Sequence, residues 1–494
     1  MGLEIERENF SEDDFQRYSR RLFECLKALK RQIREPGFGL APGKIGAELE
    51  SYLVDPEGQV LPINRDIIQR ANNPRLTVEL NKFNLEINFD PIVLSAYAFS
   101  EMEAQMDQNL ADLRRVAAGL GAEVVPIGIL PTLEGRHLSR DFMTDAIRYR
   151  VLSDTLRRMR GEDFRIQING VDELSLVCDH VALEGANTSF QFHMMVPPSD
   201  FADLFNAIQL TTPLVLAVSA NSPLLLDKLL WDETRIALFK QSIDSRHTRA
   251  VQWHQPSRVS FGHGWVREDA YELFAESVAL YAPIFPLLSA QNPLRALDSG
   301  QVPGLDELVL HTGTTWPWNR PVYSAAEGGH LRVEMRSLPA GPTNRDMCAG
   351  AALAVGLAWG LKSQIRELLA VMPFRFAEHN FYRAAQHGLS AELVWTEPKR
   401  HKAVAVSVLA LLDSLLPVAE QGLRSLGLAE TEIKTYLGVI ERRLQQRKNG
   451  AIWQKHTLAH FERRHNRHRA CRQMFALYQQ QQLSGLPLCD WDWL

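Results

Sequence analysis

Two glutamates in the stretch KIGAELESYLVD, residues 44–55, have a spacing that suggests chemistry. The stretch has the composition of a β-strand, in which successive side chains point to opposite faces, so Glu48 and Glu50 share one face. Two carboxylates on one face of a strand repel each other unless water or a cation lies between them. The spacing therefore indicates a position at which a cation could bind.

A second acidic segment is TVELNKFNLEINFD, residues 77–90. Asn81 and Lys82 are typical of a tight turn between two strands, which places Glu79 at the end of the first strand and Glu86 early in the second. One face of these strands is then acidic and rich in amides. The plain alternative is a sheet with one solvated face, on which a single glutamate has no chemical role.

A third segment, LRVEMRSL (331–338), argues against the alternative of a solvated sheet face without a chemical role. Its alternation predicts a strand with Arg332, Glu334 and Arg336 on one face. Arginine holds phosphate oxygens in a fork, and carboxylate binds hard cations. A carboxylate flanked by two guanidinium groups is therefore suited to a site that holds a metal and a phosphate together.

The segment ANTSFQFHMMVPPSD (186–200) predicts a fourth strand, with Gln191 and His193 on one face and phenylalanines on the other. A lone histidine is more often a structural residue than a ligand. His193 follows the acidic strands and precedes Glu334 in the chain, and this order makes a role as a ligand more favourable.

The elements that must position these residues follow an α+β pattern. Apolar residues recur at helical spacing from Ser11 to Ile33, up to the sequence EPGFG. Strands are expected at 44–55, 76–90, 186–196 and 329–337, and helices at 99–121, 202–219, 345–371 and 403–426. After about residue 370 the sequence predicts helices and turns only.

Composition narrows the class of protein. The chain has 494 residues, 45% of them hydrophobic, and a formal net charge of −5, so no basic field indicates nucleic acid. Its five cysteines are scattered without a zinc-binding spacing, which favours a reduced, cytoplasmic setting. The acidic N-terminus lacks the apolar core of a signal peptide, and we expect no membrane-spanning helix. The basic run HFERRHNRHRACRQ (460–473) is typical of a solvated helix face, and a nucleic-acid partner is not expected.

Taken together, the order of these motifs resembles that of the bacterial and plant glutamate–cysteine ligase family. That family includes related carboxylate–amine ligases and belongs to the glutamine-synthetase-like superfamily. The likeness also includes AVSANSPLLLDK (217–228), NFYRAAQHGLSAELV (380–394) and, weakly, RKNGAIWQ (447–454). It covers residues 44 to 455, and the order and spacing of the motifs carry it more than any single one.

The resemblance implies a fold and a reaction. An antiparallel sheet would form one wall of a funnel-shaped active site, with helices behind the sheet and a helical C-terminal region. The implied organisation is an N-terminal helix (1–43), a catalytic domain (44–370) and C-terminal helices packed on the same domain (371–494). ATP would phosphorylate a carboxylate, and an amine would attack the acyl phosphate to give an amide.

The resemblance also assigns roles to residues. Mg²⁺, or Mn²⁺ in its place, would be held by six candidate ligands: Glu48, Glu50, Glu79, Glu86, His193 and Glu334. Arg336 and Glu334 would be catalytic, and Arg336, Gln191 and Arg332 would bind the nucleotide. The substrate would contact Arg235, Arg246 and Asn221. Bacterial relatives carry His-x-His where this chain has Gln191 and His193, which leaves open whether His193 binds metal or contacts nucleotide phosphate.

Three functions are compatible with these residues. The preferred one is a magnesium-dependent ligase that joins the γ-carboxylate of glutamate to cysteine, the first step towards glutathione. The second is a ligase of the same fold for another carboxylate and another amine, because pocket residues decide the substrate. The third is a relative that binds nucleotide and regulates a partner without catalysis. The sequence leaves the oligomeric state open.

Overall fold

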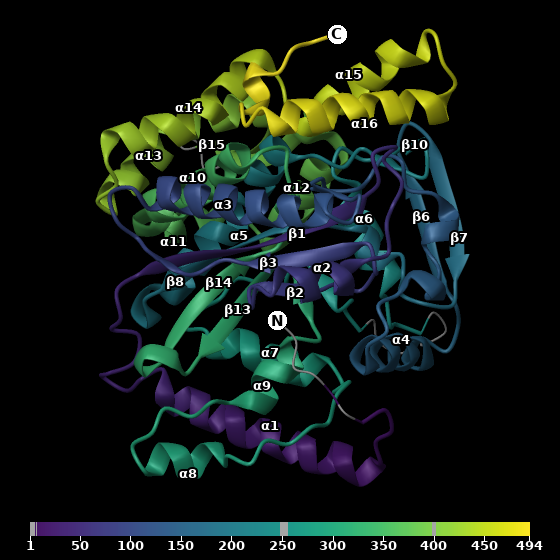
Figure 1. Ribbon diagram of the computed structural model, residues 1–494. Helices are drawn as coiled ribbons and strands as arrows, with labels where there is room; N and C mark the ends of the chain where they lie inside the picture. Colours follow the sequence, from purple (N-terminus) through teal and green to yellow (C-terminus); the bar gives the residue numbers. More distant parts are fainter. Residues whose placement is uncertain (1–4, 6, 248–254, 398–401) are drawn as a thin grey trace.

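One large antiparallel sheet organises the protein. The computed structural model describes residues 5, 7–247, 255–397 and 402–494. The sheet has the strand order β13-β14-β8-β1-β3-β2, and β4 and β5 also pair with β1 (Figure 1). Its strands are β1 (Lys44–Val54), β2 (Leu76–Val78), β3 (Asn84–Asn88), β4 (Ile92–Val93), β5 (Glu123–Val125), β8 (Phe190–Val196), β13 (Asn319–Ser324) and β14 (His330–Met335).

The register of this sheet aligns the polar residues of neighbouring strands. On one side of β1, Glu50 lies opposite Glu86 of β3. On its other side, Glu48 lies opposite Gln191 of β8, and β8 in turn places His193 opposite Glu334 of β14. Because side chains alternate along each strand, this register gathers the polar ones on a single face.

The opposite face of the sheet is apolar and is covered by helices. Three of them are α3 (Ala98–Ala118), α5 (Phe201–Ser219) and α10 (Asn344–Leu361) (Figure 1). Phe99 of α3 stacks on Phe192 of β8 with ring centroids 6.4 Å apart. The segment Pro198–Ser219 is the one described helix long and apolar enough to span a membrane, but 94% of that window is buried inside the protein. It is a core helix of the fold.

On the polar side of the sheet, helix α1 (Glu12–Gln32) packs against a group of shorter helices. Ser11 caps α1 in a capping box with Asp14. Helix α1 contacts three helices: α7 (Tyr271–Leu280), α8 (Pro293–Asp298) and α9 (Asp306–Thr312). Tyr18 donates a hydrogen bond to the carbonyl oxygen of Glu307 at 2.6 Å. These contacts tie the N-terminal helix to α9, which borders the cavity described below.

The remaining elements surround this core. The other helices before residue 372 are α2 (Asn64–Ala71), α4 (Ile147–Arg160), α6 (Thr234–Ser242) and α11 (Ile365–Val371). The smaller strand pairs in this part are β6 (Phe164–Asn169) with β7 (Glu173–Cys178), β9 (Leu224–Leu225) with β10 (Lys228–Leu229), and β11 (Val259–Ser260) with β12 (Trp316–Pro317). The helix expected over 345–371 is two helices, because a 3₁₀ turn at Lys362–Gln364 separates α10 from α11.

The C-terminal region is helical with one exception that the sequence analysis missed. Its helices are α12 (Phe374–His387), α13 (Val408–Ser425), α14 (Glu430–Gln446), α15 (Gly450–Glu462) and α16 (Arg467–Leu483). Between α12 and α13 the chain forms a hairpin of β15 (Glu392–Glu397) and β16 (Lys402–Ser407). The helix expected from residue 403 was therefore wrong in its first turn. Val404 and Val406 alternate with alanines, and this period of two outweighed the helix propensity of alanine.

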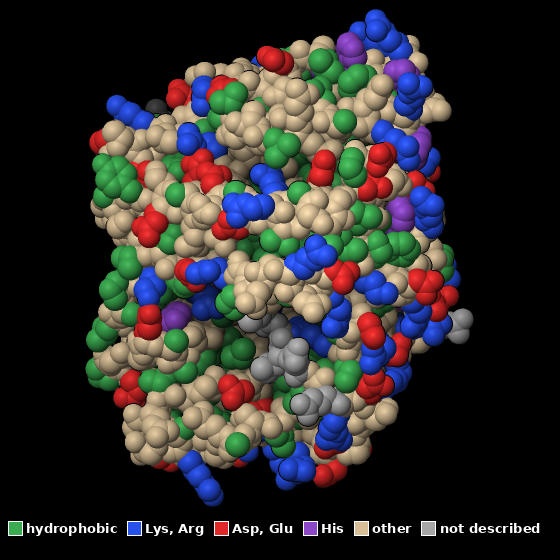
Figure 2. Space-filling view, viewed as in Figure 1, with side chains coloured by type: hydrophobic (Ala, Val, Ile, Leu, Met, Phe, Trp, Pro, Cys, Tyr) green, Lys and Arg blue, Asp and Glu red, His purple; other side chains and the backbone are tan. Residues whose placement is uncertain are grey.

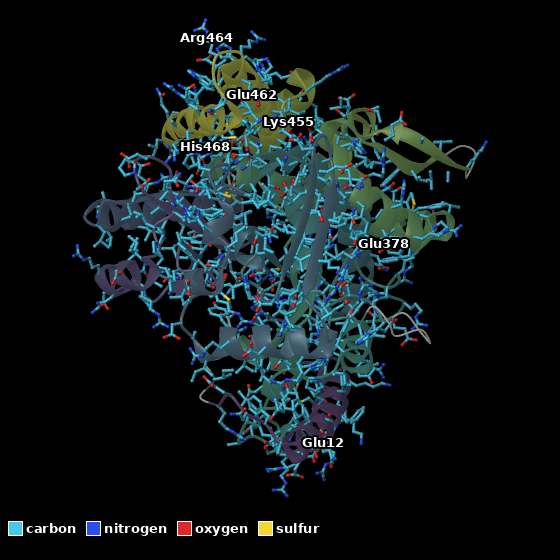
Figure 3. The ribbon with its side chains drawn as sticks, turned by 90° about the vertical axis from the view of Figure 1, so that its right-hand side faces the viewer. Glu12, Glu378, Lys455, Glu462, Arg464 and His468 are labelled. Atoms are coloured by element: carbon cyan, nitrogen blue, oxygen red, sulfur yellow. The ribbon has the colours of Figure 1, made fainter. Side chains whose placement is uncertain are left out.

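The basic run in α15 and α16 lies at one end of the molecule, with α1 at the other (Figure 3). Two of its side chains have acidic partners: Arg467 lies 3.3 Å from Asp172, and His468 lies 3.7 Å from Asp227. Figure 2 shows acidic and basic side chains interspersed over the visible face of the protein. The basic run is therefore partly neutralised within the fold.

Helices α10 and α13 cross so closely that glycine is required at the contact. A Cβ at Gly422 would lie 2.0 Å from the carbonyl oxygen of Gly356. We expect Gly422→Ala to lower the free energy of unfolding by about 1–3 kcal/mol, because overpacking forces the helices apart. Denaturant unfolding measures the change.

Gly438→Ala in α14 is the matched control, because a Cβ there would meet nothing within 4 Å. It should raise the free energy of unfolding by about 0.5–1 kcal/mol, the usual gain from replacing a helical glycine. Equal effects of the two changes would contradict the close crossing.

Candidate active site

The polar face of the sheet forms the floor of a cavity of about 1410 Å³. Strands β1, β3, β8, β13 and β14 supply the floor, and residues of α4, α6 and α9 supply the walls. Its lining includes all six residues that the sequence analysis proposed as metal ligands. The cavity is large enough for a nucleotide together with small substrates.

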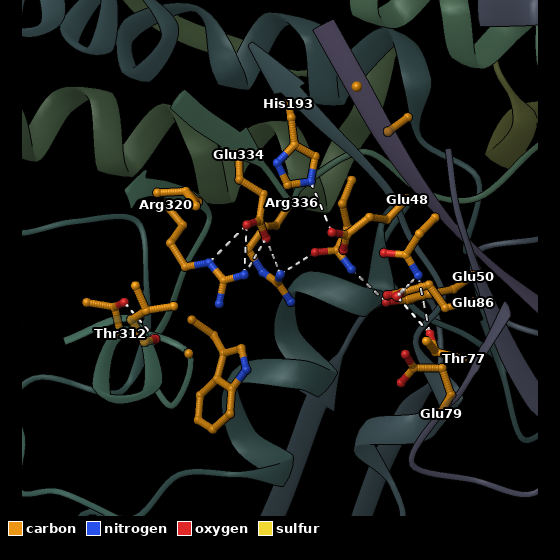
Figure 4. Close-up of a pocket in the computed structure, with 18 of the residues that line it drawn as sticks. Glu48, Glu50, Thr77, Glu79, Glu86, His193, Thr312, Arg320, Glu334 and Arg336 are labelled. Atoms are coloured by element: carbon orange, nitrogen blue, oxygen red, sulfur yellow. Dashed lines mark hydrogen bonds and ion pairs between the residues drawn. The ribbon is translucent and has the colours of Figure 1, made fainter. Parts of the chain in front are cut away.

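Three carboxylates meet at one end of this cavity. Glu50 of β1, Glu79 just after β2 and Glu86 of β3 each place an oxygen within 4.8 Å of the other two (Figure 4). Asn88 and Thr77 donate hydrogen bonds to Oε1 of Glu86 at 2.8 and 3.0 Å. We call Glu50, Glu79 and Glu86 the carboxylate cluster.

In the carboxylate cluster, the ionised form of each side chain is disfavoured when no cation is bound. Burial and the charge of Glu48 raise the pKa of Glu86 to about 7. Burial and the charge of Glu86 raise the pKa of Glu79 well above its usual value. Burial also raises the pKa of Glu50, against the opposing charge of Arg336. Oxygen ligands from three segments that repel one another in this way fit a hard divalent cation.

A second group of charged residues lies on β1, β8 and β14. Nε2 of His193 lies 3.3 Å from Oε1 of Glu48, and Arg332 donates a hydrogen bond to Nδ1 of His193 at 3.3 Å. Burial alone would raise the pKa of Glu48, but the hydrogen bond and charge of His193 lower it to about 2. The imidazole of His193 therefore stabilises the carboxylate form of Glu48.

Glu334 is held by two arginines. Arg320 of β13 donates to both carboxylate oxygens of Glu334, at 2.9 and 2.7 Å from Nη2 and 3.0 Å from Nε. Arg336 forms a further ion pair with Oε1 of Glu334. Burial disfavours the charge, yet the two guanidinium groups hold the pKa of Glu334 well below its usual range. The side chain of Glu334 is 1% exposed, whereas those of Arg320 and Arg336 are 16% and 13% exposed and border the cavity.

Gln191 connects the carboxylate cluster to the arginines. Its Nε2 donates to Oε1 of Glu50 at 2.9 Å, and its Oε1 accepts a hydrogen bond from Arg336. The amide of Ser189 donates to Oε2 of Glu50 at 2.7 Å. The structure thus brings the proposed metal ligands together in two groups, with Gln191 at their junction.

The three residues proposed to contact the substrate do not line the cavity. Arg235 is buried and donates to Glu233 and to the carbonyl oxygen of Ser337, both at 3.1 Å. Asn221 is buried and donates to the carbonyl oxygen of Ala340 at 2.9 Å. Arg246 forms an ion pair with Asp244 at 2.8 Å. In the described part of the chain, these three side chains contact other protein groups.

The sequence analysis missed several residues that do line the cavity, among them Tyr149, Glu184, Trp316 and Arg320. The alternation of NRPVYS over β13 could have indicated that Arg320 and Val322 share a face. Proline disfavours a central strand but is tolerated in an edge strand, and β13, which contains Pro321, is at one edge of the sheet. No local pattern marks Glu184, which lies in a turn.

A profile of glutamate-cysteine ligase family 2 matches residues 44–473 of the chain. The chain belongs to glutamate-cysteine ligase family 2. This confirms the family resemblance, and it identifies the protein as an ATP-dependent ligase. In this family member the sheet face with its carboxylates and arginines is the candidate active site. A sequence search against curated proteins found no match.

Solved structures that resemble this family member have low sequence identity to it. The glutamate–cysteine ligase of Francisella tularensis in complex with AMP is 11% identical with a TM-score of 0.51, and the match covers 90% of this chain and 89% of that chain. A bifunctional glutathione synthetase from Pasteurella multocida is 11% identical with a TM-score of 0.46, and the match covers 96% of this chain and 55% of that chain. The first match confirms the predicted α+β fold with its antiparallel sheet.

Proposed function

We propose that this ligase joins the γ-carboxylate of glutamate to the amino group of cysteine at the expense of ATP. The observation that carries the proposal is the row of groups from the carboxylate cluster through Gln191 to Arg336, which lies on one cavity floor. Phosphorylation of a carboxylate needs a binding site for a metal cation next to a positively charged side chain that binds phosphate. The family match supports the choice of glutamate and cysteine.

Arg336 has the position and orientation of a phosphate-binding residue. Glu334 and Gln191 hold its guanidinium group, and the group borders the cavity. A guanidinium group fixed in this way stabilises charge that develops on a transferring phosphoryl group without having to reorient. Arg332 and Gln191 are proposed as further nucleotide contacts. The neutral amine then attacks the carbonyl carbon of the acyl phosphate. The C–N bond forms, the C–O bond to the phosphate breaks, phosphate leaves, and the nitrogen gives up one proton to solvent.

The carboxylate cluster fits Mg²⁺, or Mn²⁺ in its place, because it offers three oxygen donors from separate segments. A cation bound there would neutralise negative charge on the phosphate oxygens. Glu48 and His193 are proposed as a further ligand pair, and His193 could instead contact nucleotide phosphate. Glu334 is already paired with two arginines, so its role as a ligand is the one that most needs a test.

Release of ADP by the purified protein tests the proposal. We expect ADP release that requires Mg²⁺ and is fastest with glutamate and cysteine in a panel of carboxylates and amines. Faster release with another pair would support the second candidate, a ligase of the same fold with other substrates. Nucleotide binding without ADP release from any pair would contradict a ligase and leave the regulatory relative.

A further inference from the structure

Glu184 is a cavity residue to which the proposed reaction assigns no role. It begins the 3₁₀ turn Glu184–Ala186, which ends three residues before β8 begins, and its side chain lines the cavity. Within the described part of the chain no residue donates a hydrogen bond to its carboxylate. The carboxylate is thus available to a ligand in the cavity.

The turn that carries Glu184 is held rigidly by the strands of the active site. Tyr52 of β1 donates a hydrogen bond to the carbonyl oxygen of Ala186 at 2.5 Å. Asn81, between β2 and β3, donates to the carbonyl oxygen of Ala182 at 3.0 Å. Asn81 also packs so closely on Gly185 that a Cβ there would lie 2.4 Å from its Nδ2. Glu184 is therefore positioned by the same elements that carry the carboxylate cluster.

Glu184 lines the same cavity as both groups of the site. The carboxylate interacts electrostatically with Glu50 of the carboxylate cluster and with Arg336, the proposed phosphate-binding residue. It does not belong to the group of three whose oxygens approach within 4.8 Å of one another. An amine that attacks an acyl phosphate must reach the carbon next to the transferred phosphoryl group, and Glu184 lines the cavity that also contains Glu50 and Arg336.

We propose that Glu184 binds the ammonium group of the amine substrate and thereby forms the acceptor subsite; this rests on the proposed ligase function. A carboxylate that accepts no hydrogen bond from the protein and interacts with the carboxylate cluster is stabilised by a cationic ligand. In line with this, burial and the charge of Glu50 raise the pKa of Glu184 to about 8. The chemical class recognised is a primary amine that enters the cavity protonated and loses one proton to solvent before its nitrogen attacks.

Two nucleophiles distinguish this role from a general effect on the site. Hydroxylamine is uncharged at neutral pH and traps an acyl phosphate as a hydroxamate, so it does not need an ammonium site. With the carboxylate that supports the fastest ADP release, Glu184→Gln should raise the KM for the amine by ~10- to 100-fold, the cost of losing one charged hydrogen bond. Hydroxamate formation and Mn²⁺ affinity should stay at the wild-type level.

Glu327→Gln is the matched control, because Glu327 lines the same cavity but is paired with Lys44. It should leave the KM for the amine unchanged. Glu184→Asp keeps the charge and should restore part of the affinity for the amine, which separates the role from a folding defect.

An equal loss with both nucleophiles, an unchanged KM for the amine, or a loss of Mn²⁺ affinity in Glu184→Gln would overturn the inference. A wild-type protein that forms neither amide nor hydroxamate would instead refute the proposed function, and the acceptor subsite would fall with it.

Discussion

Replacing Arg336 by alanine is expected to lower turnover by at least ~10²-fold, the usual effect of removing one preorganised charge donor. Arg336 is fixed by Glu334 and Gln191 and borders the cavity, so its guanidinium group is ready for a phosphoryl group. Glu334 keeps its bidentate partner Arg320 in this variant, which limits the loss of stability. Steady-state ADP release and thermal unfolding should be measured on the same preparation.

Two further variants make the Arg336 result specific. Arg336→Lys keeps the charge but loses the fork, and it should recover only part of the turnover. Arg442→Ala removes an exposed arginine that pairs with Asp490 and does not line the cavity. This variant should have wild-type turnover. Near-normal turnover in Arg336→Ala would refute the assigned role.

Glu334→Gln and Glu86→Gln are expected to change stability in opposite directions. Glu334 neutralises two arginines, so its replacement should lower the free energy of unfolding by about 3 kcal/mol, at the lower end for a broken buried pair because both arginines border the cavity. Burial first, and then the charge of Glu48, raise the pKa of Glu86, so its ionised form is disfavoured in the fold. A carboxylate whose pKa is higher in the folded protein than in the unfolded chain destabilises the fold when ionised, so Glu86→Gln should raise the melting temperature without metal.

The same two variants should also differ in metal binding. Glu86→Gln keeps an oxygen for the hydrogen bonds from Thr77 and Asn88 but loses the charge, so its affinity for Mn²⁺ should fall. Turnover should collapse in both variants, with Mn²⁺ affinity retained in Glu334→Gln. A loss of Mn²⁺ affinity in Glu334→Gln together with an unchanged melting temperature would show that Glu334 is a metal ligand and not the partner of Arg320 and Arg336.

The alternation of side chains predicted which residues share the polar face. Strands β1, β3, β8 and β14 lie where the sequence indicated, and they carry Glu50, Glu86, Gln191 and Glu334 to one cavity. This part of the site could be predicted from the sequence because the period of a strand is a local property of the chain. The order of the motifs supplied the family, which the profile match confirmed.

Contacts between distant segments decided the rest. Arg320 reaches Glu334 because β13 pairs with β14, and Glu184 reaches the cavity because Tyr52 and Asn81 hold its turn. Arg235, which the family resemblance proposed as a substrate contact, donates hydrogen bonds to Glu233 and to the carbonyl oxygen of Ser337. The sequence by itself determined the faces of the strands and the reaction class, because these depend on local period and motif order. The tertiary structure alone decided which charges meet, because register, strand order and burial are set by packing between segments remote in the chain.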